Sequence, residues 1–99
     1  MFRTITWRED KARLNLKEHR VSFNEAMTVF NDPLAFTEPD RKHSHGEERF
    51  TTVGQSTKNR LIRVTHLERD IVEYDVLNLH IISAREPENW EREIYEESL

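Results

Sequence analysis

Residues 48–85 read ERFTTVGQSTKNRLIRVTHLERDIVEYDVLNLHIISAR, and this stretch decides the class of fold. Residues 48–56 and 60–69 are rich in β-branched and other apolar residues and flank the turn sequence STKN, a pattern typical of paired strands. A further strand is expected at 79–85, after the charged and apolar stretch DIVEYDVLN. The sequence therefore predicts an antiparallel meander.

Helices are predicted on the N-terminal side of this meander. Residues 2–6, FRTIT, have the composition of a short first strand, and Thr6 followed by Glu9 has the spacing of a capping box that starts a helix over about 8–18. Ser22 and Glu25 have the same spacing and start a second helix, which Pro33 ends. We expect a helical hairpin, whose second helix buries the residues that recur three and four apart: Phe23, Ala26, Met27 and Phe30.

Two further segments complete the predicted fold. The segment PLAFTEPDRKHSHGE at 33–47 contains two Pro and a Gly, and it is expected to be a surface loop with at most a short strand at 34–36. A last helix begins near Pro87, packs Trp90 and Ile94 against the core, and ends at about Glu97 with its carboxylates facing outward. The sequence thus predicts an α+β fold in which an antiparallel sheet carries an N-terminal helical hairpin and a C-terminal helix.

The composition bounds the class of protein. The 99 residues suit one domain over 1–99, and without cysteine the chain has no disulfide, cysteine-ligated metal site or thiol nucleophile. No apolar run approaches the length of a membrane span, and the N-terminal MFRTITWRED lacks the apolar core of a secretion signal. We therefore expect a cytoplasmic protein with no membrane partner.

The net charge of -4 is unevenly distributed. Residues 1–85 contain 14 Lys and Arg against 13 Asp and Glu, whereas residues 86–99 contain one Arg against six Glu, so the two parts carry +1 and -5. Because RNA binding depends on cations that neutralise phosphates, the acidic end is not expected to contact RNA. Its expected roles are to close the core and to offer charge to a basic partner. The alternative is that the Glu residues only solubilise an exposed helix, which is the commoner role of such a run.

Strict alternation along the strands predicts a sheet with two different faces. One face is apolar and turns to the helices: Phe50, Ile62, Val64, Ile82 and Ala84. The other face carries four arginines and a serine: Arg49, Arg63, Arg69, Ser83 and Arg85. One interpretation of this second face is a cationic floor that binds RNA phosphates and stabilises the charge of a phosphorane. The alternative is an ordinary solvated face with surface ion pairs.

The segment HSHGEER at 43–49 is the second candidate for chemistry. Imidazoles and carboxylates beside Arg49 are the minimum set for metal-independent RNA cleavage, with His43 and Glu47 as the acid and base. Alternatively, His43 and His45 with a following Glu could hold a metal ion in a hydrolase, or the segment is simply a polar loop.

Other polar residues are expected to be structural. One surface stripe of the first helix is formed by residues that recur every four positions: Trp7, Lys11, Asn15 and His19. Trp7 is expected to be a core residue, and His19 is expected to close the helix C-terminus. His66 and His80 lie inside strands and are expected to be hydrogen-bonded residues without a catalytic role.

Short segments in a fixed order carry a resemblance to a known family. They are Trp7, Lys11, Asn15, KEH (17–19), VSFNEAMTVFNDPLAF (21–36), Asp40, HSHGEERF (43–50), VG (53–54), RLI (60–62), HLER (66–69), IISARE (81–86) and ER (91–92). This ordered set resembles the BrnT toxin family over nearly the whole chain. The resemblance implies a curved antiparallel sheet with helices on one side, as in RelE-type ribonuclease toxins, and an RNA-cleaving activity that arrests translation.

The resemblance also implies a partner and a set of site residues. The partner would be a BrnA-like ribbon-helix-helix antitoxin, and DNA would be bound only through the toxin-antitoxin complex. No cofactor or metal is implied. Residues carried over from the motifs, together with those of the cationic face, give catalytic candidates and substrate-binding candidates. The catalytic candidates are His43, Glu47, Arg49, Arg69 and Arg85, and the substrate-binding candidates are Lys11, Arg63, Ser83 and Arg92.

The chain departs from the family pattern at three places. Arg20 stands where the pattern usually has Gly after the first helix, which predicts a residue with a Cβ at positive φ. His80 stands where the pattern usually has Arg, and the hairpin between Arg69 and His80 is long. The alternatives to a ribonuclease toxin are a non-catalytic binding module and the metal-dependent hydrolase.

Overall fold

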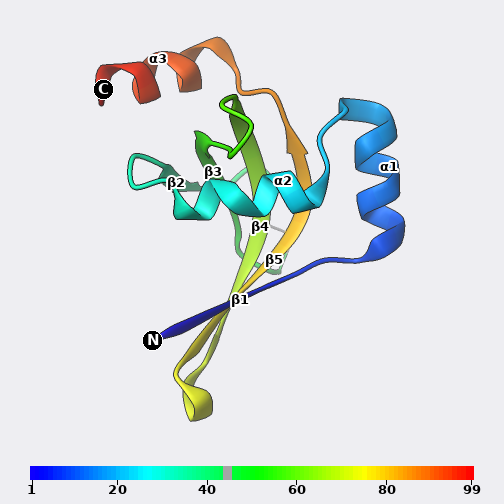
Figure 1. The fold of residues 1–99 in the computed structure, drawn as a ribbon. Coiled ribbons are helices and arrows are strands. Elements are labelled where there is room, and N and C mark those ends of the chain that lie inside the picture. The colour runs from blue at the N-terminus through cyan, green and yellow to red at the C-terminus, as the bar shows by residue number, and fades with distance from the viewer. Residues whose placement is uncertain (44–45) are drawn as a thin grey trace.

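The computed structural model describes residues 1–43 and 46–99 and shows an α+β fold, as predicted (Figure 1). One five-stranded sheet has the order β1-β5-β4-β3-β2. The strands are β1 (Phe2–Thr6), β2 (Phe36–Pro39), β3 (Arg49–Gln55), β4 (Leu61–Ile71) and β5 (Val76–Arg85). The helices are α1 (Glu9–His19), α2 (Phe23–Met27) and α3 (Asn89–Glu97), and single 3-10 turns lie at Thr28–Asn31 and Val72–Tyr74. Within the described residues, no helix is long and apolar enough to cross a membrane.

The sheet is mixed, so the prediction of a wholly antiparallel sheet is wrong. Strands β2 to β5 form the predicted antiparallel meander, but β1 pairs with β5 in parallel, from Phe2 opposite Val76 to Thr6 opposite His80. After β1 the chain crosses one face of the sheet through α1 and α2 before it enters β2 at the other edge (Figure 1). The short strand predicted at 34–36 lies instead at Phe36–Pro39, paired with β3.

The core lies on the face of the sheet that α2 covers. Phe23, Ala26 and Val29 pack there against apolar residues of β4 and β5. The strand residues of this core are Ile62, Val64, Ile81 and Ala84, each at most 1% exposed. The predicted second-helix face is correct for Phe23 and Ala26, whereas Met27 is exposed.

A β-bulge in β5 overturns one part of the predicted face. Thr65 pairs with Ser83 and His66 pairs with Ile81, so Ile82 is left without a partner in the register. The extra residue reverses the alternation of side chains. Ile81 therefore occupies the core in place of the predicted Ile82, and His80 turns to the opposite face.

The first helix starts without the predicted capping box. Its N-cap is Arg8, with no side-chain cap, and the Thr6 hydroxyl bonds to His80 instead. Its end follows the prediction, because Arg20 adopts the left-handed conformation at φ 58° and donates its N–H to Leu16. For the second helix, one half of the predicted capping box is present, because the Ser22 hydroxyl accepts a hydrogen bond from the Glu25 N–H.

The side chain of Glu25 does not close a second capping box, because it is 2% exposed and pairs with Arg60 at 2.6 Å. The predicted helical hairpin is not confirmed, since α1 and α2 each pack on β5.

Asn15 joins α1 to the free edge of β5. Its amide donates to the carbonyls of Val21 and Ala84 at 2.9 and 2.8 Å, and its Oδ1 accepts the Ala84 N–H at 3.0 Å. Ala84 lies beyond the last residue of β5 that β1 pairs with, His80. Asn15 is only 5% exposed, so the predicted surface stripe on α1 is wrong at this position. Trp7 packs edge-on against Phe23, as expected of a core residue.

The orientation of α3 differs from the prediction. Glu91 and Tyr95 are buried at 1% and 3% exposure, while Trp90 and Ile94 are 51% and 39% exposed. Polar partners explain the inversion: Glu91 pairs with Arg63 of β4, and the Tyr95 hydroxyl donates to Asp32 at 2.7 Å. The prediction that all the carboxylates of this helix face outward is therefore wrong for Glu91.

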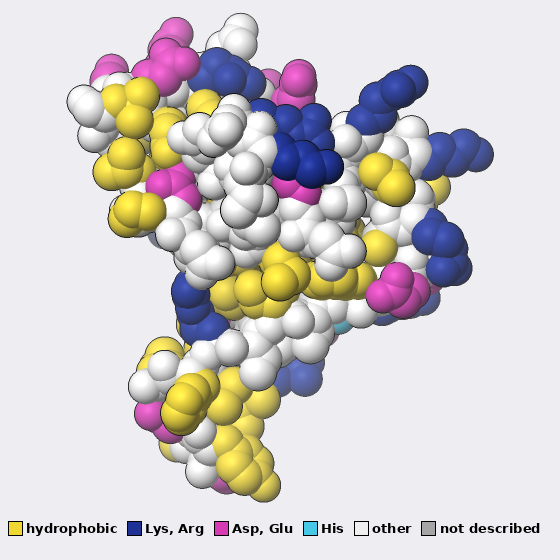
Figure 2. Space-filling model, viewed as in Figure 1, with side chains coloured by type: hydrophobic (Ala, Val, Ile, Leu, Met, Phe, Trp, Pro, Cys, Tyr) yellow, Lys and Arg dark blue, Asp and Glu magenta, His cyan; other side chains and the backbone are white. Residues whose placement is uncertain are grey.

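Strands β4 and β5 continue past the end of β3 and form a projecting arm with β1 (Figure 1). The first residue of β3, Arg49, pairs with Leu67, so residues 68–71 have no strand partner on the β3 side among the described residues. The tip exposes Phe2, Val72 and Tyr74, and Figure 2 shows hydrophobic side chains at the lower end of the molecule, where the arm lies. The arm therefore leaves one edge of β4 open.

Candidate active site

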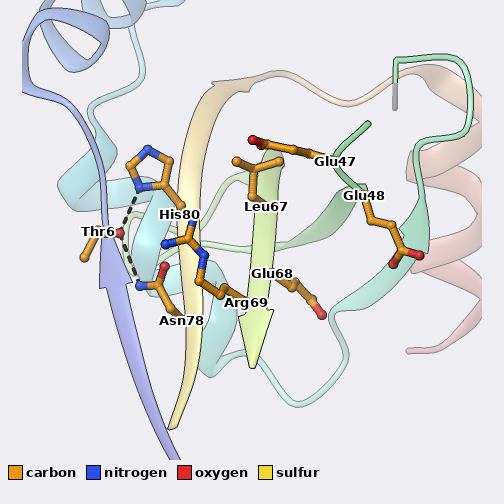
Figure 3. Close-up of a pocket in the computed structure, with 8 residues that line it drawn as sticks. All are labelled: Thr6, Glu47, Glu48, Leu67, Glu68, Arg69, Asn78 and His80. Atoms are coloured by element: carbon orange, nitrogen blue, oxygen red, sulfur yellow. Dashed lines mark hydrogen bonds between the residues drawn. The ribbon is translucent and has the colours of Figure 1, made fainter. Parts of the chain in front are cut away.

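An open pocket of about 690 Å³ lies where β3 ends against β4 (Figure 3). Side chains reach it from β1, β4, β5 and the segment before β3. Its lining residues are Thr6, Glu47, Glu48, Leu67, Glu68, Arg69, Asn78 and His80. Because strand β3 begins only at Arg49, opposite Leu67, the pocket opens at the base of the arm.

One side of the pocket combines an imidazole with a guanidinium. His80 Nδ1 lies 2.8 Å from Thr6 Oγ1, which also accepts from Asn78 Nδ2 at 3.2 Å. When Thr6 donates to Nδ1, the ring proton of His80 resides on Nε2. Arg69 of β4 lies beside these residues (Figure 3), and within residues 1–43 and 46–99 it makes no ion pair or side-chain hydrogen bond.

Carboxylates line the rest of the pocket. The Glu47 side chain passes over Leu67 toward the side of β4 that holds His80, while Glu48 and Glu68 lie on the other side of β4 (Figure 3). Burial and the neighbouring Glu48 carboxylate raise the pKa of Glu68 above its ordinary value. Like charges that share one site favour the protonated acid.

This arrangement supplies the groups that acid-base chemistry on a phosphodiester requires. An unpaired cation can bind a phosphate, and an imidazole and a carboxylate can exchange protons with hydroxyl groups. In the described part of the chain, no three His, Asp or Glu side chains are grouped as metal ligands. His45, one of the two imidazoles in the proposed metal site, lies outside the described residues.

The predicted arginine face is divided into two parts. The strand register places Arg49, Arg63, Arg69 and Arg85 on one face of the sheet. However, Arg63 pairs with Glu91 at 3.0 Å and Arg85 with Glu88 at 3.2 Å. Both pair with carboxylates of α3 or its N-cap. Arg63 lies six residues along β4 from Arg69, a separation of about 20 Å, and Arg85 is the partner of Arg63 on β5.

Other predicted site residues lie away from the pocket. His43 is exposed and bonds to Asp40 at 3.1 Å, and Arg49 borders a neighbouring hollow with Arg41 and Phe50. Glu48 lines both hollows, so the two adjoin.

The substrate-binding candidates do not gather at the pocket either. Lys11 is exposed on α1, and Arg92 borders a hollow beside Tyr95. Ser83 lies on β5 opposite Thr65, at the bulge. Of the nine candidates, only Glu47 and Arg69 line the pocket.

His80 is the residue that strand alternation missed. It is hydrogen-bonded, as expected, but it also lines the pocket beside Arg69. The signal that could have found it is its position directly before the IISARE motif, where it stands out only as a departure from the usual Arg. Glu68 was also within a motif, HLER, but was not chosen as a site residue.

Comparisons with known proteins agree with this fold. Residues 7–91 match the family model described as "Ribonuclease toxin, BrnT, of type II toxin-antitoxin system". None of the curated proteins compared with the chain matches it.

A solved structure of the Brucella abortus ribonuclease toxin BrnT has a similar fold, with a TM-score of 0.63 and 20% sequence identity. The similarity covers 90% of this chain and 100% of the Brucella protein. Since the family model spans most of its length, this chain belongs to the BrnT ribonuclease toxin family of type II toxin-antitoxin systems.

Proposed function

We propose that the chain is a metal-independent endoribonuclease that cleaves RNA in the pocket at the base of the arm. One observation carries the proposal: Arg69, which has no ion-pair partner among the described residues, lies beside His80 and Glu47 in one pocket. Arg63 and Arg85, by contrast, already have carboxylate partners. Membership of a ribonuclease toxin family supports the class of reaction.

The proposed reaction is attack by a ribose 2'-hydroxyl on the adjacent phosphorus. Glu47 takes the hydroxyl proton, and the 2'-oxygen forms a bond to phosphorus. Arg69 stabilises the additional negative charge of the phosphorane. The bond to the 5'-oxygen breaks, and His80, acting as the imidazolium whose Nδ1–H is donated to Thr6 Oγ1, gives its Nε2 proton to that oxygen and is left as the neutral imidazole. The products are a 2',3'-cyclic phosphate and a free 5'-hydroxyl, and the step needs no metal ion.

A comparison of two arginine variants tests the location. Arg69→Ala is expected to lower the rate of RNA cleavage by roughly 100-fold or more, the usual effect of removing one charge-stabilising group. Arg85→Ala is the matched control, because Arg85 shares the sheet face but pairs with Glu88. A cationic floor over the whole face requires both variants to be inactive. A fully active, folded Arg69→Ala would refute the pocket.

The cofactor requirement separates the remaining alternatives. We expect cleavage of an RNA oligonucleotide to persist in EDTA and to yield the cyclic phosphate. A hydrolase that uses His43 and His45 to hold a metal would lose activity to the chelator, and a binding module would cleave no RNA under either condition.

The proposal extends to the cellular role. We infer that cleavage arrests translation in the cytoplasm and that a BrnA-like ribbon-helix-helix antitoxin neutralises the toxin. DNA would be bound only by the complex, through the antitoxin. The family membership supports an antitoxin partner. Growth arrest on expression, relieved by co-expression of the antitoxin, tests this part.

A further inference from the structure

Helix α3 is fixed to the sheet by polar contacts. Glu91 is 1% exposed, and its two carboxylate oxygens bind Arg63 Nε at 3.0 Å and the Glu88 N–H at 2.9 Å. One turn further on, Tyr95 donates to Asp32, which also accepts from the Gln55 N–H at 2.7 Å. These contacts determine which side of the helix faces solvent.

The side left in solvent carries an apolar stripe. Trp90 and Ile94, four residues apart, are 51% and 39% exposed. Residues at this spacing adjoin on a helix surface, so the two side chains form one strip instead of two scattered contacts. Figure 2 shows both carboxylates and hydrophobic side chains at the α3 end of the molecule. An exposed Trp in such a strip is typical of an interface anchor.

Acidic residues border this stripe. The helical period places Glu93 and Glu97 next to Trp90 and Ile94, and residues 86–99 contain six Glu against a single Arg, Arg92. Arg92 lies on the opposite flank, in a hollow with Tyr95 and Glu96. The surface therefore suits a partner segment with apolar anchors and Lys or Arg beside them.

We propose that Trp90 and Ile94, with Glu93 and Glu97 beside them, dock a basic amphipathic segment of the antitoxin. This rests on the antitoxin partner inferred under the proposed function. RNA is unsuited to the same surface, because each carboxylate repels phosphate.

The position of α3 adds a consequence for inhibition. The helix contacts Arg63, and Arg63 lies six residues along β4 from Arg69 in the pocket. This separation of about 20 Å is the span of roughly six extended residues. An antitoxin anchored on α3 must therefore extend along the sheet to block the pocket, so anchoring and inhibition involve different parts of the antitoxin.

The test uses as its probe the protein encoded by the reading frame next to the gene for this chain, and it measures the binding of that protein. The double variant Trp90→Ser, Ile94→Ser is expected to raise the Kd by about 30-fold or more, the effect of losing a hot spot. The matched control is Val72→Ser, Tyr74→Ser at the tip of the arm, where the side chains are 78% and 75% exposed. We expect the control to bind like the wild type, and all variants to cleave RNA at the wild-type rate.

A second variant tests the charges. Glu93→Gln, Glu97→Gln is expected to slow association and to weaken its dependence on salt, since steering by opposite charges is screened by ions. Unchanged affinity in both α3 variants, or an equal loss in the arm control, would overturn the docking surface while leaving the antitoxin partner in place. If the wild type itself does not bind the gene product, the partner inference fails and the docking surface fails with it.

Discussion

Replacing Asn15 by Ala should destabilise the fold by about 3 kcal/mol. The substitution removes the three buried hydrogen bonds that the amide makes with Val21 and Ala84, and each is worth roughly 1 kcal/mol. The Ala84 N–H and carbonyl also lose their partner, because they lie beyond the end of β1. For a domain of this size, the loss corresponds to a fall in Tm of roughly 15 °C.

Urea unfolding followed by circular dichroism measures this free energy. Lys11→Ala is the matched control, since Lys11 is exposed one turn earlier on the same helix, and its effect should stay within about 0.5 kcal/mol. Hydrogen exchange at the Ala84 amide should accelerate in the Asn15 variant alone. If Asn15→Ala loses less than about 1 kcal/mol relative to Lys11→Ala, Asn15 does not close the edge of β5 as argued.

Four further predictions follow from individual residues. Gly54→Ala should cost about 1–3 kcal/mol of unfolding free energy, the usual cost of overpacking a core, because the new Cβ would lie 2.8 Å from the Ala35 Cβ; a neutral effect in urea unfolding would contradict this. Burial and Asp32 raise the pKa of Tyr95 to about 12. Its contribution to stability is complete below pH 10 and is lost as the pH rises through 12, so Tyr95→Phe should be less sensitive to alkali in unfolding experiments. Burial lowers the pKa of His66 to about 4, so stability should fall as the pH drops from 6.5 toward 4, and His66→Leu should remove that part of the slope. Because His80 and not His43 lines the pocket, His43→Ala should leave the pH profile of RNA cleavage unchanged, whereas the loss of one limb of the profile would assign His43 to proton transfer.

Features determined by neighbouring residues could be predicted from the sequence. The turn at STKN and the Ser22 cap each depend on a few adjacent residues, and the structure confirms them. The antiparallel pairing of β3 with β4 follows for the same reason, because a short turn joins them. The left-handed Arg20 was expected from the Gly that the BrnT pattern usually has at this place, and it is confirmed as well.

Features that depend on distant contacts could not be predicted. The bulge at Ile82 turns His80 into the pocket, yet a strand with a bulge and one without it have the same composition. The orientation of α3 depends on Arg63 and Asp32, which lie 28 and 63 residues away from their partners in the chain. Without those contacts, the helical spacing of Trp90 and Ile94 indicated that these two side chains are buried.

The parallel pairing of β1 with β5 has a consequence for synthesis of the toxin. Thr6 and His80, which meet in the pocket, are 74 residues apart in the chain. At roughly 5–20 residues per second, a ribosome needs about 4–15 s to make the intervening segment. Such a long-range contact also slows folding. The pocket is therefore one of the last parts of the molecule to be assembled, and a nascent chain that has not reached β5 lacks His80 and carries no complete site.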